Sequence, residues 1–227
     1  MSILRRLLTA LMPQDCLLCG AYSGDALLCP ACDAELPILP ANACPVCAEA
    51  SPGSAVCGAC LKERPRFDAT VARFRYAFPV DRLVQTLKYQ RRTTTADFLA
   101  DAMLSGSRPS GDVIVPLPLS AARLRERGFN QAVEIARPLA RALQLPLELD
   151  GCLRSRDTTP QAVLPWKQRR ANVRMAFECS IDFGGRSVIV VDDVMTTGAT
   201  LDEFAGVLKA RGAMRVTNWV AARTLRD

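Results

Sequence analysis

Two adjacent carboxylates, Asp192 and Asp193, follow four branched aliphatic residues at 188–191. An uninterrupted apolar run of this kind is typical of a buried parallel strand, and parallel sheets bind ligands beyond the carboxyl ends of their strands. Carboxylates placed there can accept hydrogen bonds from a sugar diol, directly or through Mg²⁺. The pair therefore predicts a binding site rather than a part of the core.

The residues after the pair, Met-Thr-Thr-Gly-Ala-Thr at 195–200, favour a phosphate. They offer hydroxyls, a glycine that allows close backbone approach, and the amides of a helix N-terminus. A diol site followed at once by a phosphate site predicts a ribose 5-phosphate ligand. The alternative interpretation is an acidic turn before a threonine-capped helix.

Eight of the ten cysteines form four Cys-x-x-Cys pairs, and this spacing presents two thiolates to one metal ion. We expect a double zinc ribbon with two structural zinc ions, in which the pairs are used sequentially. A crossed arrangement of the pairs, disulfides, and redox Cys-x-x-Cys centres are the alternatives. The predicted metal ligands are Cys16, Cys19, Cys29, Cys32, Cys44, Cys47, Cys57 and Cys60. The remaining two, Cys152 and Cys179, are expected in the core.

Composition limits the chemistry that is available. The chain of 227 residues contains no histidine, which excludes Ser-His and Cys-His nucleophile pairs and histidine metal ligands. Its net charge is +6, and residues 123–174 hold eleven Lys or Arg against five acids. This basic segment favours a polyanionic partner, with a solvated arginine-rich surface as the alternative. No stretch is long and apolar enough to span a bilayer, so a cytoplasmic protein is expected.

Alternating apolar strands and amphipathic helices indicate an α/β fold with a mainly parallel sheet flanked by helices. Three segments are expected: a short N-terminal helix at 1–15, the double zinc ribbon at 16–66, and the α/β domain at 67–227. The predicted strands are 67–78, 112–118, 187–191 and 214–223. The predicted helices are 79–90, 96–104, 131–143 and a helix from about 199 to 211.

The Val-Val-Asp-Asp-Val-Met-Thr-Thr-Gly-Ala-Thr stretch resembles the motif with which type I phosphoribosyltransferases bind 5-phosphoribosyl-1-diphosphate (PRPP). Four further stretches resemble the ComF family, also described as ComFC/GntX-like amidophosphoribosyltransferases, in which a zinc ribbon precedes a phosphoribosyltransferase fold. These stretches are Leu-Lys-Tyr at 87–89, Val-Pro-Leu-Pro-Leu-Ser at 115–120, 123–132 and 159–177. The resemblance covers nearly the whole chain.

The resemblance implies a PRPP site, a mobile loop that closes over it, and catalysis by Asp192, Asp193 and Arg127. The implied PRPP-binding residues are Lys88, Pro118, Leu119, Ser120, Asp192, Asp193, Thr196, Thr197, Gly198, Ala199 and Thr200. The implied mobile-loop residues are Arg123, Arg125, Arg127, Gly128, Phe129, Asn130 and Gln131. Arginines there can neutralise a leaving pyrophosphate, because the guanidinium fork binds phosphate oxygens bidentately.

Three functions follow from these expectations. The first is a Mg²⁺-dependent phosphoribosyltransferase with an unspecified acceptor, and the second is a protein that binds PRPP or a nucleotide without turnover. The third is a protein that binds single-stranded DNA, because ComF-like proteins are implicated in DNA uptake during natural transformation. Arg154, Arg156, Lys167, Arg169 and Arg174 are the candidates for contact with DNA or with a competence or helicase protein. Gln161, Arg170 and Asn172 are candidates for contact with the base of a ligand or with a partner, and a purely structural helix is the alternative for their segment.

Overall fold

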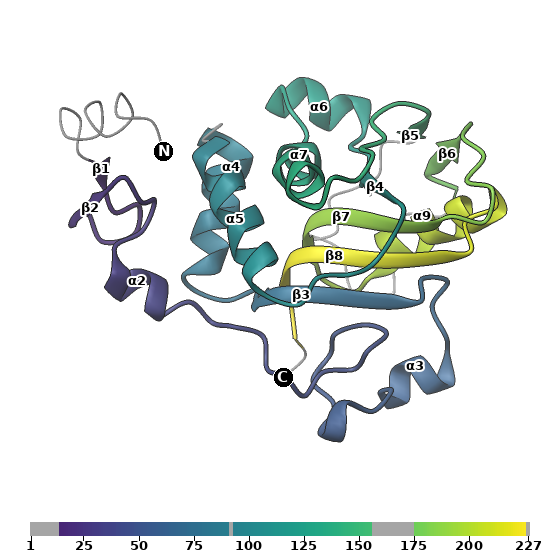
Figure 1. The fold of residues 1–227 in the computed structure, drawn as a ribbon, viewed down its shortest axis with the longest axis horizontal. Helices are drawn as coiled ribbons and strands as arrows, with labels where there is room; N and C mark the ends of the chain where they lie inside the picture. The colour runs from purple at the N-terminus through teal and green to yellow at the C-terminus, as the bar shows by residue number, and fades with distance from the viewer. Residues whose placement is uncertain (1–13, 91–92, 156–174, 226–227) are drawn as a thin grey trace.

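A four-stranded parallel sheet forms the centre of the computed structural model, which describes residues 14–90, 93–155 and 175–225. The strand order is β3-β8-β7-β4, and helices cover both faces (Figure 1). The strands are β3 (Ala69–Arg75), β4 (Val113–Pro116), β7 (Ser187–Met195) and β8 (Arg215–Arg223). The helices around them are α4 (Val80–Gln90), α5 (Thr93–Ser105), α7 (Gln131–Leu143) and α9 (Ala199–Ala210). The predicted α/β class is confirmed.

Strand β7 is apolar at successive positions because each of its two faces packs against a different helical layer. Ile189 and Val191 belong to the core beneath α4, α5 and α7, whereas Val188 and Val190 belong to the core beneath α9. Side chains alternate between the faces of a strand, so a strand covered on both faces must be apolar throughout. This burial fixes the direction in which the carboxyl end of β7 leaves the core.

Strand β7 is longer than its sequence indicates. The apolar run predicts an end at Val191, but pairing with β8 continues to Met195, opposite Arg223. The two aspartates are therefore strand residues rather than the first residues of a loop. The neighbouring β8 is the cause, because it stays buried to its end at Arg223 and continues to supply backbone hydrogen-bonding groups.

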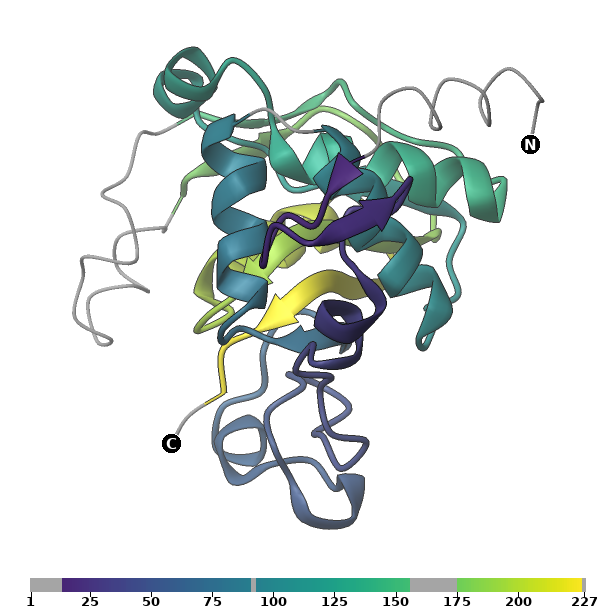
Figure 2. The same cartoon turned by 90° about the vertical axis from the view of Figure 1, so that its left-hand side faces the viewer.

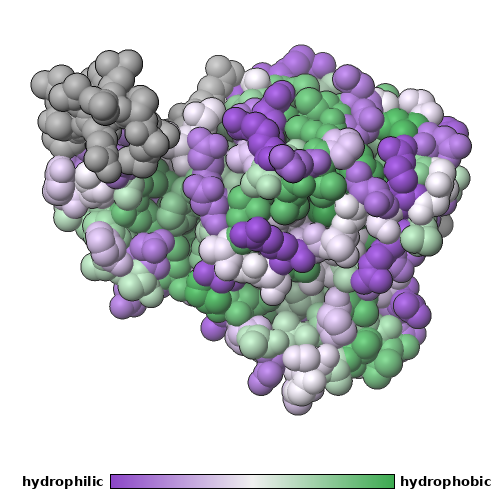
Figure 3. Space-filling model, viewed as in Figure 1, coloured by the Kyte–Doolittle hydropathy of each residue, from purple (hydrophilic) through white to green (hydrophobic). Residues whose placement is uncertain are grey.

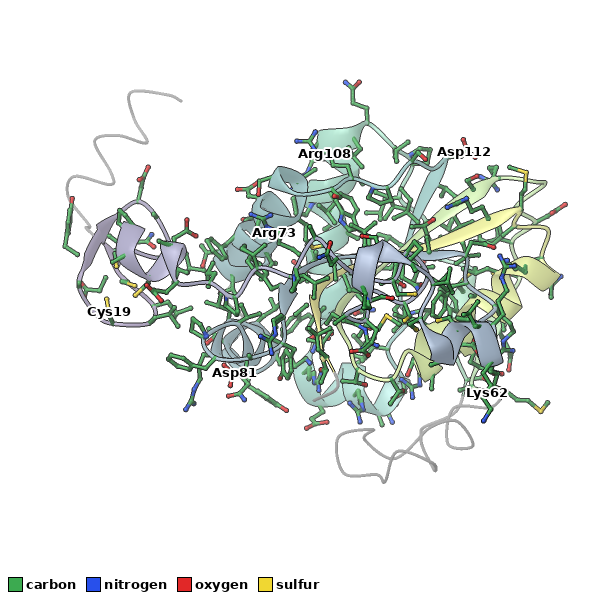
Figure 4. The ribbon with its side chains drawn as sticks, turned by 90° about the horizontal axis from the view of Figure 1, so that it is seen from below. Cys19, Lys62, Arg73, Asp81, Arg108 and Asp112 are labelled. Atoms are coloured by element: carbon green, nitrogen blue, oxygen red, sulfur yellow. The ribbon has the colours of Figure 1, made fainter. Side chains whose placement is uncertain are left out.

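The cysteine pairs lie in two separate segments at different places on the molecule (Figure 2). The first contains β1 (Gln14–Asp15), β2 (Tyr22–Gly24) and α2 (Pro30–Ala34), and the second contains η1 (Pro52–Ser54) and α3 (Gly58–Lys62). Cys19 and Lys62 lie at opposite ends of the view in Figure 4. The first segment packs against α4 and α5, where apolar surface gathers at the junction in Figure 3, and the second packs below β3.

The segment predicted to be a mobile loop is partly helical. Helix α6 (Ala121–Arg127) ends at Gly128, whose φ of 76° gives the left-handed C-cap that glycine favours. A two-stranded ribbon, β5 (Cys152–Arg154) with β6 (Phe177–Cys179), brackets residues 156–174, which lie outside the described residues. The predicted N-terminal helix also lies outside them, apart from Gln14 and Asp15 in β1. Among the residues that are described, no helix has the length and apolarity to cross a membrane.

Candidate functional site

A cavity of about 420 Å³ opens at the carboxyl end of the sheet, where β4 and β7 separate. The pairing of β4 with β7 ends at Pro116 opposite Val191, and one further hydrogen bond joins Leu117 N to Val191 O at 2.9 Å. Beyond this point β7 continues beside β8 alone, while the chain after Leu117 turns away into α6. The separation leaves Asp192 and its successors facing the cavity, as expected for this class of sheet.

Twelve of the site residues expected from the sequence line this one cavity, although they come from four separate stretches of the chain. They are Lys88, Pro118, Leu119, Arg123, Arg127, Asn130, Gln131, Asp192, Asp193, Thr196, Gly198 and Thr200. The other six expected residues lie beside the lining rather than in it. They are Ser120, Arg125, Gly128, Phe129, Thr197 and Ala199.

The acidic pair is held by an ion pair to Lys88 of α4. The Lys88 Nζ lies 2.6 Å from Asp193 Oδ2, and Asp192 Oδ1 accepts a hydrogen bond of 2.9 Å from Asp193 N. Asp193 is on the same face of β7 as Val191, which directs its side chain toward α4. The two carboxylates thus reach the cavity in different environments, one paired with a cation and one not directly paired.

These environments separate the pKa values of the pair. Burial, reinforced by the charge of Asp193, raises the pKa of Asp192 well above its ordinary value. Burial also acts to raise the pKa of Asp193, but the adjacent Lys88 ammonium outweighs it and lowers that pKa. The same contact outweighs burial for Lys88 and raises the pKa of its ammonium. Two neighbouring carboxyls with diverging pKa values are typical of functional sites.

The stretch after β7 makes a tight turn into α9. Gly198 adopts φ 80° at the N-cap, and a Cβ there would lie 2.5 Å from Met195 Cε. Thr197 Oγ1 accepts a hydrogen bond of 3.2 Å from Ala199 N, which accounts for its place beside the lining. Helix α9 is 12 residues long, so its N-terminus provides amides and a positive dipole end at the cavity wall.

Arginines and an amide form the opposite wall of the cavity. Arg123 and Arg127 line it from α6, and the Arg127 guanidinium lies over the Tyr89 ring, 5.7 Å from its centroid. Asn130 caps α7 by accepting from Ala132 N at 3.0 Å, and its amide donates to Leu117 O at 3.0 Å. The cap therefore also fixes the stretch that follows β4. Arg125 is exposed on α6.

The cavity lining also contains Tyr76, Gln85 and Arg154, which were not among the site residues expected from the sequence. Tyr76 follows the end of β3, and its strand position alone was a usable signal for this edge of the sheet. The sequence predicts that Arg154 contacts a partner, but Arg154 lines the cavity, and its guanidinium lies 5.5 Å from the centroid of the Phe177 ring. Gln85 lacks such a signal, because α4 reaches the cavity only through tertiary packing.

The eight paired cysteines form two clusters of four in sequential order, and the crossed arrangement is not found. Within each cluster all sulfur atoms lie within 4.8 Å of one another. A tetrahedral zinc site with Zn–S bonds of about 2.3 Å has S···S edges of about 3.8 Å. The observed distances of 3.7 Å for Cys19–Cys29 and 3.6 Å for Cys47–Cys57 fit that geometry. Each cluster has the donor set of a closed structural metal site.

Crowding gives the thiols of a cluster unequal acidities. Burial acts to raise the pKa of Cys16, but backbone N–H groups, led by that of Cys29, donate to its sulfur and lower the pKa to about 6. In the same cluster, the hydrogen bond with Cys19 raises the pKa of Cys32 to about 12. A thiolate beside protonated thiols is the arrangement that a divalent cation completes, because the cation stabilises the remaining thiolates.

The two unpaired cysteines of the sequence are cross-strand neighbours. Cys152 of β5 pairs in register with Cys179 of β6, and burial raises the pKa of the Cys152 thiol. Cys179 is buried and Cys152 is half-buried. The expectation of a core position is thus fulfilled for Cys179, and both thiols belong to the ribbon that brackets residues 156–174.

Comparisons with known proteins give the same two parts. Residues 7–61 match a double zinc ribbon domain, and residues 130–225 match a phosphoribosyl transferase domain. The DNA utilization protein YhgH of Escherichia coli O157:H7 is 35% identical, covering 80% of this chain and 84% of the relative. Competence protein F of Haemophilus influenzae is 34% identical, covering 74% of this chain and 78% of the relative.

A glutamine PRPP amidotransferase from Bacillus subtilis, solved in complex with ADP and GMP, is similar over part of the chain. The identity is 23% and the TM-score is 0.39, with 55% of this chain and 25% of that protein covered.

Proposed function

Because this chain belongs to the ComF family of phosphoribosyltransferase-like proteins, we propose that its cavity binds PRPP together with Mg²⁺ and acts on the 5-phosphoribosyl group. One observation carries the proposal. The acidic pair at the end of β7, the Gly198 turn into α9 and the arginines of α6 line the same cavity. The proposed diol site, the proposed 5-phosphate site and the arginines proposed to bind pyrophosphate therefore surround one cavity.

Each wall of the cavity binds a different part of PRPP. Asp192 and Asp193 hold the ribose hydroxyls, and the amides and hydroxyls at 196–200 hold the 5-phosphate. Arg123 and Arg127 face the pyrophosphate, whose oxygens the guanidinium fork binds bidentately. The carboxylates suit Mg²⁺, which prefers oxygen ligands. Burial and the charge of Asp193 raise the pKa of Asp192, and a cation beside Asp192 would stabilise its ionised form. Bound Mg²⁺ supplies charge neutralisation for the diphosphate.

Group transfer at this site proceeds by displacement at the anomeric carbon, with pyrophosphate as the leaving group. Such a reaction depends on positioning, on neutralisation of the leaving charge and on exclusion of water. The residues present meet these needs without histidine. Arg127 is directed to the leaving group, and its contact with Tyr89 restricts the guanidinium before the ligand arrives.

The two cysteine clusters are proposed to hold one zinc ion each. Four sulfur ligands leave no open coordination position, so the ions stabilise the fold and take no part in group transfer. The short helices and strands of residues 14–66 supply little core of their own, which makes their folding dependent on metal.

We expect PRPP with Mg²⁺ to stabilise the protein against heat, because a ligand that binds the folded state alone raises its free energy of unfolding. At a hundredfold excess over the dissociation constant the gain is about 2.7 kcal/mol, or roughly 5–10 °C in Tm for a chain of this size. The double variant Asp192→Asn/Asp193→Asn keeps the shape of the site and loses the shift. Differential scanning fluorimetry and calorimetric titration measure both effects.

The matched control changes two exposed carboxylates of α5, Asp97→Asn/Asp101→Asn, which leaves the shift intact. A full PRPP response in the variant of the acidic pair would overturn the assignment of the diol site. No response of the wild-type protein to PRPP and Mg²⁺ would overturn the proposed ligand.

A second candidate function is the binding of single-stranded DNA. Relatives carry names that refer to DNA utilization and competence. The mouth of the cavity supports this candidate, because Tyr89 is 69% exposed and stacks with Arg127. An exposed ring beside arginine is the kind of platform on which unpaired bases stack.

A further inference from the structure

Arg223, the last residue of β8, has a side chain that is only 2% exposed. Removal of a guanidinium from water costs several kcal/mol unless its hydrogen bonds and its charge are both compensated. The partners of Arg223 therefore indicate what holds it in place. They come from two parts of the molecule that are far apart in the sequence.

On one side Arg223 binds the second cysteine segment. Its Nη2 lies 3.1 Å from Glu49 Oε2, and its Nε donates to Cys47 O at 2.9 Å. Cys47 belongs to the second cluster, and the Glu49 carbonyl accepts from Cys44 N at 2.7 Å. The turn that presents the cluster sulfurs thus also places both partners of the guanidinium.

On its other side Arg223 binds the stretch that leads into the candidate phosphate loop. Its Nη1 donates to Met195 O at 3.2 Å and also to the carbonyls of Thr196 and Thr224. Thr224 N donates to Met195 O at 3.0 Å as well. The carbonyls at 195 and 196 are thereby held by the Arg223 guanidinium, which fixes the entry to the Gly198 turn.

Packing joins the same two parts. Cys44, Cys60 and Val46 share a core with Met195 and Leu201, the residues that flank the loop. The first cluster is differently placed, because Cys16 and Cys29 pack in the other core with α4 and α5 (Figure 1). The second cluster is therefore connected to the loop both through a buried charge and through shared apolar contacts.

We propose that Arg223 is a positioning residue that makes the conformation of the loop Thr196–Thr200 depend on the metal occupancy of the second cysteine cluster. The consequence for ligand affinity rests on the proposed PRPP function, whereas the consequence for loop order does not. When the second cluster loses its metal, the turn at Cys47 and Glu49 loosens, and the guanidinium loses the partners that balance its charge. The loop carbonyls then lose their common donor.

A thermodynamic cycle between the cluster and Arg223 tests the proposal in the full chain. Cys57→Ser removes a ligand of the second cluster, and Arg223→Met removes the guanidinium at similar volume. Zinc per chain is measured together with hydrogen exchange of peptides covering 192–201 and the affinity for PRPP with Mg²⁺. Cys57→Ser is expected to lower the zinc content by one ion, to speed exchange in the loop and to weaken PRPP binding by about 10-fold.

The decisive result is whether the effects of Cys57→Ser and Arg223→Met on loop exchange and affinity are non-additive. In the Arg223→Met background, Cys57→Ser is expected to cause no further change in loop exchange or affinity, because the connection is already broken. The first-cluster variant Cys32→Ser serves as the matched control and leaves loop exchange within about twofold of wild type. Glu49→Gln, which removes one charge and keeps the shape, gives the same loop effect as Cys57→Ser at full zinc occupancy.

Additive effects of Cys57→Ser and Arg223→Met on loop exchange would overturn the proposal, as would equal effects of the two cluster variants. If Arg223→Met does not fold, Arg223→Lys completes the cycle, since a single ammonium cannot span both sets of partners. If the wild-type protein does not bind PRPP, the proposed function fails while the exchange cycle still decides the role of Arg223.

Discussion

Asp192, Asp193 and Lys88 form a group of two carboxyls and one ammonium at the cavity. The Lys88–Asp193 ion pair is close to neutral as a unit, so the charge of the half-buried Asp192 carboxylate remains uncompensated. Burial and the charge of Asp193 accordingly raise the pKa of Asp192. A Mg²⁺ ion or a ligand hydroxyl near Asp192 would favour the ionised form. The apo site is thus destabilised by the same groups that bind the proposed ligand, which is common where stability and function compete.

The substitution Asp192→Asn is expected to stabilise the apo protein at neutral and alkaline pH. A carboxyl with a raised pKa stabilises the fold below its unfolded pKa of about 3.9, and that contribution is lost as the pH rises through the folded pKa. The Tm of the variant therefore rises relative to that of wild type as the pH increases. At pH 8 the expected difference is roughly 2–8 °C, or ~1–2 kcal/mol in the free energy of unfolding. Thermal melts without ligand at several pH values between 4 and 8 measure the gain.

A constant difference between Asp192→Asn and wild type across this pH range would contradict the assigned pKa direction. Asp101→Asn, which removes an exposed carboxylate of α5, is the reference variant for these melts.

At the scale of elements, the site depends on an unequal length of neighbouring strands. Strand β7 runs four residues past the end of its pairing with β4, and Met195 then turns through Gly198 into α9. The turn is tight because Met195 Cε and the Phe67 ring occupy the space beside Gly198. Phe67 and Met195 also belong to the core that contains the second cysteine cluster, and packing in this core supports the turn.

Gly198→Ala is expected to lower stability by about 1–3 kcal/mol and to weaken PRPP binding. Alanine pays the cost of a positive φ, and its methyl group meets Met195 Cε at 2.5 Å. Gly185→Ala is the matched control, because Gly185 has φ 82° and no heavy atom within 4 Å of the position of an added Cβ. Chemical unfolding and PRPP titration of both variants separate backbone strain from the clash, and equal losses in the two would show that the contact with Met195 is unimportant.

Across the whole molecule, features with a local signal could be predicted and features made by tertiary contacts could not. The helix at 131–143 and the two cysteine clusters follow from periodicity and spacing, and the structure has both. The extension of β7 depends on β8, and the Lys88–Asp193 pair depends on how α4 packs, so neither has a local signal. The sequence predicts only a strand position for Arg223, because no residue near it in the sequence indicates its partners at Cys47 and Glu49.

Positive charge is concentrated in residues 123–174, which contain eleven Lys or Arg and five Asp or Glu. Arg123, Arg127 and Arg154 line the cavity, so we propose that these three contact the ligand of the cavity rather than a partner. Arg156, Lys167, Arg169 and Arg174 lie outside the described residues, and their role toward a partner stays a prediction. The same holds for Gln161, Arg170 and Asn172, predicted to contact a ligand base or a partner. Single-stranded DNA would find phosphate contacts along this segment and a stacking platform at Tyr89.

We therefore expect the protein to bind single-stranded DNA with steep salt dependence and little sequence preference. Each phosphate contact contributes a slope of about −0.7 in log affinity against log salt, so four contacts lose about 50-fold between 50 and 200 mM salt. Arg169→Glu/Arg170→Glu removes two phosphate contacts and lowers the magnitude of the slope by about 1.4. The control Lys62→Glu/Arg64→Glu makes the same charge change at two exposed residues outside the basic segment, and it leaves the slope nearly unchanged. Fluorescence anisotropy with oligonucleotides of different sequence measures these slopes. Equal effects of the two pairs would assign the binding to net charge alone, and absence of binding at 50 mM salt would leave the small-molecule site as the function of the chain.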